Sequence, residues 1–290
     1  MTEKRTALFA NILEKVARNP LCLILPLVLY MFAFYIYPLL RMFTLSLFSP
    51  DLTSKHYRSF FQTATNLYSL RVTFEIGLLV TILCLLIGYP MSYYLSTRPP
   101  KKANLLLILV LIPLWTSVLV RTYAWIAILG RNGVINQMLQ KSGVVEQPLK
   151  LIYNQLGLTI GMVHVMMPFM VLSLYSVMVG IDRNLLKAAQ NLGASPFRAF
   201  RKVFLPLSMP GILAGCILVF IISVGFFVTP ALLGGPKELM IAMVIDQAVE
   251  VMLNWGFASA ASFILLFLIL GIFLISGKMV GFDKLWGKKI

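Results

Sequence analysis

Six stretches of the sequence are long enough and apolar enough to cross a lipid bilayer as helices. A membrane helix needs about 20 mainly apolar residues, and these runs are continuous, whereas the strands of a membrane barrel alternate apolar and polar residues. The chain is 59% hydrophobic and only 12% charged, whereas a soluble protein has about a quarter of its residues charged. We therefore predict an all-α membrane protein whose single transmembrane domain, residues 1–290, has spans at about 21–47, 70–96, 104–129, 156–180, 209–231 and 259–281.

The basic residues indicate how these spans are oriented. Lys and Arg gather in the cytoplasmic loops of membrane proteins, and most of the 25 Lys and Arg residues fall in segments that share a side with residues 1–20. We therefore expect residues 1–20 to be a cytoplasmic segment, both termini to be cytoplasmic, and the first span to be an uncleaved signal anchor. The formal net charge of +15 is then explained by topology and not by nucleic-acid binding.

The loop between the fourth and fifth spans has the features of two short helices joined by a sharp corner. Asp182 is a suitable N-cap for a helix over about 183–192, and Gly193 after it tolerates the positive φ of a helix end. Ser195 is a suitable cap for a second helix that begins at Pro196, where the missing N–H is harmless. The sequence therefore predicts a helix–corner–helix element on the cytoplasmic side.

The second helix of this loop, which as a whole covers residues 181–208, carries an apolar stripe at Phe197, Phe200 and Phe204. We expect Leu205–Pro206 to end the helix just before the fifth span, because a residue that precedes proline avoids the helical conformation. Exposed aromatic and basic side chains on ordered helices favour a docking element for a groove on another protein over a purely topological role.

This loop resembles the EAA loop of binding-protein-dependent ABC importer permeases. That motif is an E-A-A triplet, a Gly after three further residues and an I-x-L-P ending after nine more. The chain has Ala188–Ala189, Gly193 and Val203–Pro206 at the same spacing. Lys187 stands where the motif has its acidic residue, so a salt bridge through that carboxylate would be absent or reversed in sign.

Three longer segments extend the resemblance over about residues 20–280. Residues 69–96 are similar to the second span of this family, and residues 112–136 and 226–249 are similar specifically to the permeases of spermidine/putrescine importers. Related permeases for opines, thiamine and ferric iron share much of this pattern, so the same machinery with one of those substrates stays open.

The resemblance implies the type I ABC importer permease fold with a cytoplasmic coupling helix, in a bacterial inner membrane, and transport by alternating access. It also implies two ABC ATPase subunits on the cytoplasmic side, a second and different permease subunit, and an extracytoplasmic solute-binding protein. ATP and Mg²⁺ would bind to the ATPase subunits, because this chain has no G-x-x-x-x-G-K-[ST] phosphate loop. The residues that would couple the ATPase to the spans are Lys187, Ala188, Ala189, Leu192, Gly193, Ser195, Pro196, Phe197, Phe200 and Pro206.

Charged residues inside the spans are candidates for the transport pathway, because a charge at the bilayer centre costs about 3 kcal/mol or more and marks a function or a partner. Glu75 lies early in the second span and Arg121 past the middle of the third. They form a structural ion pair in one interpretation; in the other, Glu75 faces the pathway and attracts a cation. Tyr123 and Trp125 are either interfacial aromatic residues or a stacking wall for an amine.

The outer end of the fifth span contains Phe226, Phe227 and Thr229–Pro230, a pattern that predicts a broken helix suitable for a gate. Beyond it, a predicted outer helix carries Asp246 and Glu250 on one face. Three interpretations of these two carboxylates stay open: an attractor for cations, a solvated face, or a contact for the binding protein.

Other chemistry is not indicated by the sequence. Cys22, Cys84 and Cys216 are isolated in apolar runs, and His56 and His164 have no partner at ligand spacing, so we propose no metal site. No nucleophile–base pair or phosphate cradle supports an enzyme. The alternative class is a self-sufficient secondary transporter or channel, which would need titratable relays in the membrane and no docking loop.

Overall fold

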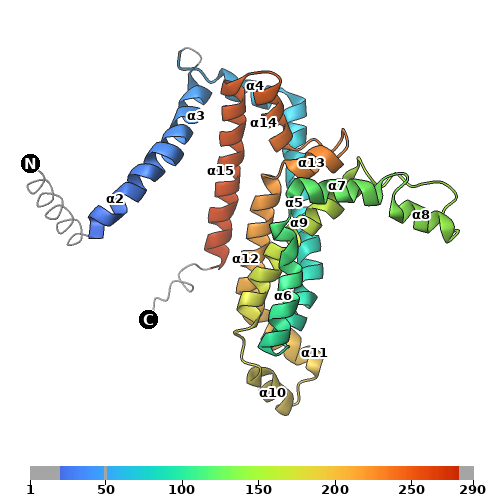
Figure 1. Ribbon diagram of the computed structural model, residues 1–290. Helices are drawn as coiled ribbons and strands as arrows, with labels where there is room; N and C mark the ends of the chain where they lie inside the picture. The colour runs from blue at the N-terminus through green and yellow to red at the C-terminus, as the bar shows by residue number, and fades with distance from the viewer. Residues whose placement is uncertain (1–19, 49–50, 281–290) are drawn as a thin grey trace, which may run out of the picture.

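The computed structural model describes residues 20–48 and 51–280, and this part of the chain is mostly helical. Its helices, of which η1 and η2 are π-helical turns, are α2 (Pro20–Met31), η1 (Phe32–Ile36), α3 (Tyr37–Leu47), α4 (Lys55–Gln62), α5 (Ala64–Ser96), α6 (Pro100–Trp115), α7 (Val118–Leu129), α8 (Val134–Lys141), α9 (Gln155–Met178), α10 (Asn184–Asn191), α11 (Pro196–Ala199), η2 (Phe200–Phe204), α12 (Leu205–Val224), α13 (Val228–Leu233), α14 (Ile241–Glu250) and α15 (Trp255–Val280). Figure 1 shows α10 and α11 at one end of the long helices and α4 and α14 at the other.

Five of the described helical segments are long and apolar enough to cross a membrane, and a sixth span forms if the bent pair of α6 with α7–α8 counts as one. The five are Ile24–Leu47, Ala64–Ser96, Gln155–Met178, Pro196–Val224 and Trp255–Ile275. α5 begins well before the expected residue 70, and α9 ends close to the expected residue 180.

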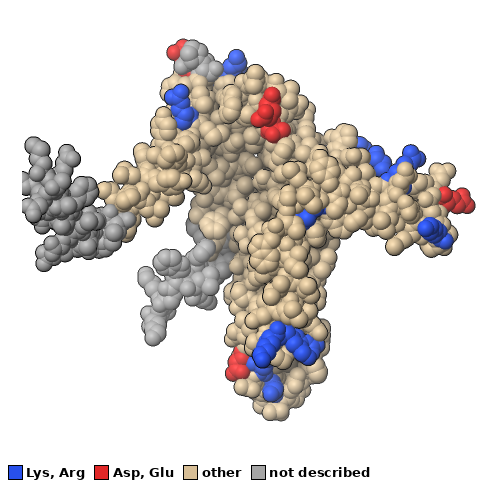
Figure 2. Space-filling view, in the orientation of Figure 1, with Lys and Arg blue, Asp and Glu red and all other residues tan. Residues whose placement is uncertain are grey.

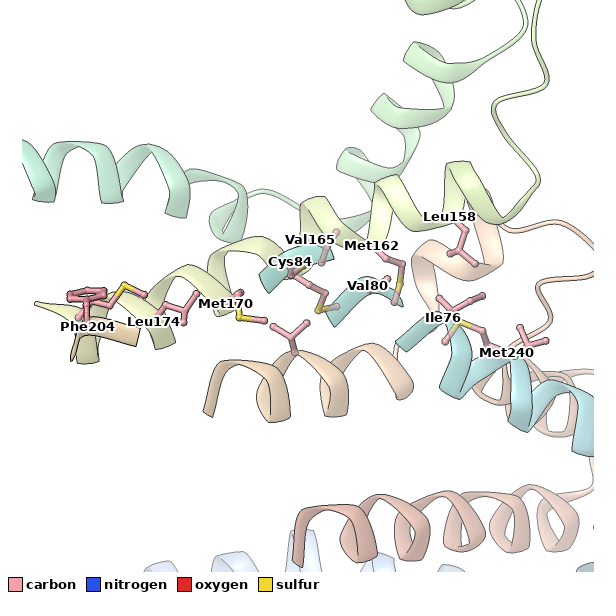
Figure 3. Close-up of a cluster of buried hydrophobic side chains, with 14 residues drawn as sticks. Ile76, Val80, Cys84, Leu158, Met162, Val165, Met170, Leu174, Phe204 and Met240 are labelled. Carbon is pink, nitrogen blue, oxygen red and sulfur yellow. The ribbon is translucent and has the colours of Figure 1, made fainter. Parts of the chain in front are cut away.

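The centre of the fold is a three-helix core of α5, α9 and α12. Figure 3 shows the buried side chains of α9 following its length, from Leu158 at one end to Leu174 beside Phe204 at the other. Methionines of α9, among them Met162 and Met170, are fully buried in this core. Met is unbranched and flexible, so it fills irregular gaps between helices.

Glycines bring α9 and α12 into direct contact. A Cβ atom added to Gly215 would lie 2.8 Å from the Sδ of Met170, and one added to Gly211 would lie 3.0 Å from the Cβ of Val177. Gly211 and Gly215 are one turn apart and therefore share a face of α12. Such small residues allow membrane helices to approach closely, which matters because lipid provides no hydrophobic drive for helix association.

The first span stands apart from this core. Its apolar side chains from Ile24 to Ile36 are exposed in this chain, and Figure 1 shows α2 extending away from the other helices. Further along, α3 packs against α15, where the rings of Phe43 and Phe263 meet edge to face with 5.1 Å between their centroids. An apolar helix without neighbours in its own chain faces lipid or another subunit.

Two prolines are accommodated by π-helical turns and do not end their helices. Pro206 follows η2, where the N–H of Leu205 donates to the carbonyl oxygen of Phe200, five residues back. Pro38 follows η1 in the same way. The wider turn relieves the clash of a proline ring with the carbonyl four residues back. The expected helix end at Pro206 is therefore wrong, and the helix continues to Val224.

Two of the predicted spans are broken. A bend of 95° at Thr116–Ser117 separates α6 from α7, so residues 104–129 do not form one straight span. Neither residue has a helical backbone, which interrupts the ladder of helical hydrogen bonds. The expected span 209–231 is also shorter as a helix, because α12 ends at Val224 and α13 begins anew at Val228.

Candidate functional site

The loop between α9 and α12 forms the predicted corner. Asp182 Oδ1 accepts a hydrogen bond from the N–H of Asn184 at 2.9 Å, at the start of α10. Gly193 has a φ of +86°, which favours glycine because it has no Cβ. The Ser195 hydroxyl accepts a hydrogen bond from the N–H of Arg198 at 3.3 Å, at the start of α11. Gly193 and Ser195 confirm the predicted corner and the second helix start. The first start is shifted by one residue, because Arg183 is the N-cap of α10 and Asp182 lies just before it.

The tip of this loop presents large apolar side chains beside basic ones. Leu192 is 90% exposed and Phe197 is 72% exposed. The other proposed coupling residues are exposed at Lys187, Ala188, Gly193, Ser195, Pro196 and Pro206, and half-buried at Ala189 and Phe200. Figure 2 shows Lys and Arg side chains gathered at this end of the molecule. Exposed apolar side chains of this size, surrounded by polar residues, mark an interaction surface.

The three phenylalanines of the predicted aromatic stripe, on α11 and η2, point in different directions. Phe204 is buried, and its ring meets that of Tyr93 in α5 edge to face at 4.9 Å between centroids. Phe200 meets the same tyrosine at 5.5 Å and stacks on Phe204 at 5.8 Å. Phe197, by contrast, faces away from the bundle. The two inner rings therefore fix the loop to α5, and the outer ring is left free to bind a partner.

A polar contact also ties the start of α10 to the end of α5. Arg183 Nη2 donates to the Ser96 hydroxyl at 2.6 Å. The same guanidinium lies 4.8 Å from the ring centroid of Phe204 and 5.4 Å from that of Tyr93, a cation–π arrangement. Sequence reasoning missed this contact, because 87 positions separate Arg183 from Ser96 and no local spacing relates them.

Glu75 does not pair with Arg121, so that interpretation of the sequence is wrong. Its Oε1 accepts from the Nε of Arg71 at 2.6 Å, one turn earlier on α5, and both side chains are largely exposed. The i,i+4 spacing of Arg71 and Glu75 is the signal that would have found this pair. The negative charge of Glu75 is compensated within its own helix.

Arg121 is instead buried on α7 with 9% of its surface exposed. Its Nε and Nη1 atoms have no hydrogen-bond partner among the described residues. One turn further along, Trp125 Nε1 donates to His164 Nδ1 in α9 at 3.2 Å, and the two rings meet edge to face. Trp125 therefore faces α9, whereas Tyr123 is 58% exposed and fits an interfacial position.

The two broken spans meet at one junction, formed by α7, α9 and α13. The hydroxyl groups of Thr122 in α7 and Thr229 in α13 lie 3.3 Å apart, and both residues are buried. Thr229 also packs against α9 at Gly161, where an added Cβ would lie 2.9 Å from its methyl group. Figure 1 shows this junction toward the end of the bundle that carries α14.

The other pathway candidates lie just before α13 and on α14. Phe226 and Phe227 fall in the gap between α12 and α13, and Phe226 packs against the three-helix core. Asp246 and Glu250 are exposed on α14. Among the described residues, no hydrogen bond or ion pair joins these two carboxylates to Arg121.

Sequence reasoning missed His164 and Thr122, which contact Trp125 and Thr229 from other helices. His164 has no partner within its own segment, and the contact appears only when α7 folds back over α9. Within the part of the chain that the structure describes, no group of His, Cys, Asp or Glu side chains is arranged to hold a metal ion.

Residues 7–280 match the family described as "Binding-protein-dependent transport system inner membrane component". The spermidine/putrescine transport system permease protein PotB of Haemophilus influenzae is 40% identical over 184 residues, which are 63% of this chain and 64% of that protein. PotB of Escherichia coli strain K12 is 37% identical over 201 residues, 69% of this chain and 73% of that protein. The inner membrane ABC transporter permease protein YdcU of the same strain is 32% identical over 219 residues, 71% of this chain and 69% of that protein.

The fold also has a counterpart among solved structures. A chain in the crystal structure of a bacterial alginate ABC transporter, in complex with an alginate pentasaccharide-bound periplasmic protein, aligns with a TM-score of 0.77 at 18% sequence identity. The alignment covers 92% of this chain and 96% of that one. At this level of identity the similarity concerns the fold alone.

Proposed function

The chain belongs to the family of binding-protein-dependent transport system inner membrane components, the permease subunits of ABC importers, and we propose that it imports a polyamine such as spermidine or putrescine. It is a transport subunit and not an enzyme. The observation that carries the substrate proposal is the similarity to two permeases named for spermidine and putrescine, at 40% and 37% identity. The chain spans 64% of the first of these proteins, so the substrate needs a direct test.

Two exposed carboxylates on α14 support the proposal of a cationic substrate. Asp246 and Glu250 are exposed on α14, and neither is neutralised by an ion pair among the described residues. Exposed carboxylates raise the local concentration of cations and so their rate of arrival. An opine, thiamine or ferric iron remains the alternative cargo.

The proposed energy source is ATP hydrolysis on two partner ATPase subunits, with ATP and Mg²⁺ bound there and not to this chain. These subunits dock on α10 and α11, around Leu192 and Phe197. The continuous helix from Pro196 to Val224 and the contact of Arg183 with Ser96 then carry the movement into α12 and α5. The broken helices at Thr116–Ser117 and at Phe226–Phe227 are the proposed outer gate.

The chain is a multi-pass protein of the inner membrane. We propose that α10 and α11 lie on the cytoplasmic side together with both termini, because Lys and Arg are concentrated in those segments. The remaining partners would be a second, different permease subunit and a solute-binding protein at the opposite face.

The test is uptake by the complete importer, expressed with its own second permease, ATPase and binding protein in a host that lacks polyamine importers. We expect ATP-dependent uptake of labelled spermidine or putrescine, which unlabelled polyamine suppresses and thiamine, an opine or ferric iron does not. Suppression by one of those three instead would reassign the substrate. Gradient-driven flux through this chain alone in liposomes would favour the secondary-transporter alternative.

Replacement of Arg183 tests whether its contact with Ser96 carries movement from the docked ATPase into α5, separately from the docking itself. We expect Arg183→Met to lower uptake about tenfold while ATPase recovery with the complex stays within about twofold, because a hydrogen bond from a charged donor is worth about 1.5–3 kcal/mol. The matched control is Arg201→Met, an exposed cation in the same loop, which should leave uptake within about twofold because exposed substitutions have small effects. Unchanged uptake in Arg183→Met would show that this contact transmits nothing.

A further inference from the structure

An apolar groove of about 300 Å³ lies between α5 and α6, close to the turn that joins these two helices. Its walls are formed by Met91, Tyr94, Leu95, Leu106, Leu109 and Val110. Tyr94 and Leu109, which come from opposite walls, are 50% and 58% exposed. In a chain that crosses the membrane, such a groove either takes up a lipid chain or is covered by another protein.

Both walls of the groove lead to a basic side chain at the same end. On α6, Lys102, Leu106 and Val110 follow one another at intervals of four residues and therefore share a face of the helix. On the α5 side, the guanidinium of Arg98 lies over the ring of Tyr94, 4.1 Å from its centroid. Four residues of a helix span about 6 Å, so these cations stand about one turn beyond the apolar lining.

The cations at this end of the groove have no acidic partner in the described part of the chain. Arg98, Lys101 and Lys102 are exposed, and none of them forms an ion pair there. Asp182, the described carboxylate at this end of the molecule, accepts a hydrogen bond from the N–H of Asn184 instead. Figure 2 shows that basic side chains dominate this end. Three neighbouring positive charges are therefore available to an anion.

We propose that the groove between α5 and α6 binds an anionic phospholipid of the cytoplasmic leaflet, with an acyl chain in the groove and the phosphate between Arg98 and Lys102. A phospholipid has its charge at the end of its chains, which is the order of apolar lining and cations found here. Basic pockets between spans on the cytoplasmic side are suited to such headgroups. The lipid would hold the end of α5 two residues from Ser96, to which Arg183 of the coupling loop is bonded.

The test counts the lipids that stay bound to the complete importer. The purified complex is equilibrated in detergent with equal amounts of phosphatidylglycerol and phosphatidylcholine that carry the same acyl chains, and native mass spectrometry measures what is retained. We expect phosphatidylglycerol to be preferred about tenfold or more. The variant Arg98→Gln, Lys101→Gln, Lys102→Gln should lose this preference, because each basic residue near an anionic headgroup contributes about fivefold in affinity.

A groove variant and a charge-matched control separate the two parts of the site. Leu109→Trp fills the groove and leaves the cations in place, so it should lower retention of both lipids about tenfold. The variant Arg198→Gln, Arg201→Gln, Lys202→Gln removes the same charge from exposed positions of the coupling loop. We expect it to keep the preference for phosphatidylglycerol within about twofold of the wild type. Recovery of the assembled complex shows that each variant is folded.

Four results would overturn the proposal. Equal retention of the two lipids by the wild type would show that the cations do not select a headgroup, and an equal loss in the coupling-loop control would show that total charge is what matters. Displacement of phosphatidylglycerol by soluble glycerol phosphate would indicate a site for free phosphate. Loss of the second permease from Leu109→Trp, with lipid retention unchanged, would make the groove a subunit interface. Lipid retention does not depend on the cargo, so a failure to import polyamine would leave this site unaffected.

Discussion

Replacing Leu192 and Phe197 by aspartate together is expected to abolish both ATPase association and uptake, while the chain still inserts into the membrane. These are the two most exposed large apolar side chains of the loop, at 90% and 72% of their surface. Neither packs against the core, so the substitutions leave the folded bundle unchanged. The measurements are recovery of the ATPase with the purified permease, uptake, and the amount of chain in the membrane.

The size of this effect follows from burial in a partner. Complete burial of a Leu or Phe side chain contributes about 1.5–3 kcal/mol, and placing a carboxylate in an apolar groove adds a desolvation cost. Two such losses amount to at least about 4 kcal/mol, which is about a thousandfold in affinity. Association should therefore fall below detection at ordinary protein concentrations.

The control isolates the loss of apolar contact from the gain of negative charge. Gln190→Glu adds one negative charge on an exposed position of the same helix and keeps the shape of the side chain. We expect ATPase recovery to change by no more than about fivefold in this variant, because an exposed charge contributes at most about 1 kcal/mol. Normal recovery and normal uptake in the Leu192→Asp, Phe197→Asp variant would disprove the docking role of this surface.

The features of the loop that sequence could predict are those determined by local chemistry. Asp182 and Ser195 accept hydrogen bonds from the first N–H groups of the helices that follow them, and Gly193 adopts a positive φ. Each depends on residues at most three positions away. The long apolar helices were predictable for a similar reason, because bilayer thickness fixes the length of each run.

Features determined by contacts between distant segments could not be predicted. The rule that proline ends a helix failed at Pro206, because a π-helical turn removes the clash on which the rule depends. The bend at Thr116–Ser117 follows from α7 packing across α9, through Trp125 and His164. Glu75 is different, because its partner Arg71 lies one turn earlier on the same helix and follows from local spacing.

Enlarging the glycines of α12 is expected to disrupt the three-helix core. In Gly211→Val, Gly215→Val, the new side chains would occupy space held by Val177 and Met170 of α9, which lie 3.0 Å and 2.8 Å from the added Cβ positions. Overpacking of a core costs about 1–3 kcal/mol per site, and the two sites lie on one face of α12. We therefore expect a large fall in the thermal unfolding midpoint in detergent, and loss of uptake.

A third glycine provides a control of the same chemistry in the same kind of helix. A Cβ added at Gly271 of α15 meets nothing within 4 Å, so Gly271→Val should keep the wild-type midpoint and uptake. The single variant Gly215→Ala adds one methyl group, which Met170 can partly accommodate because its side chain is flexible. The expected order of stability is therefore Gly271→Val, then Gly215→Ala, then Gly211→Val, Gly215→Val. An equal loss in Gly271→Val would mean that valine weakens any of these helices, and that the close approach of α9 and α12 is not what the glycines of α12 maintain.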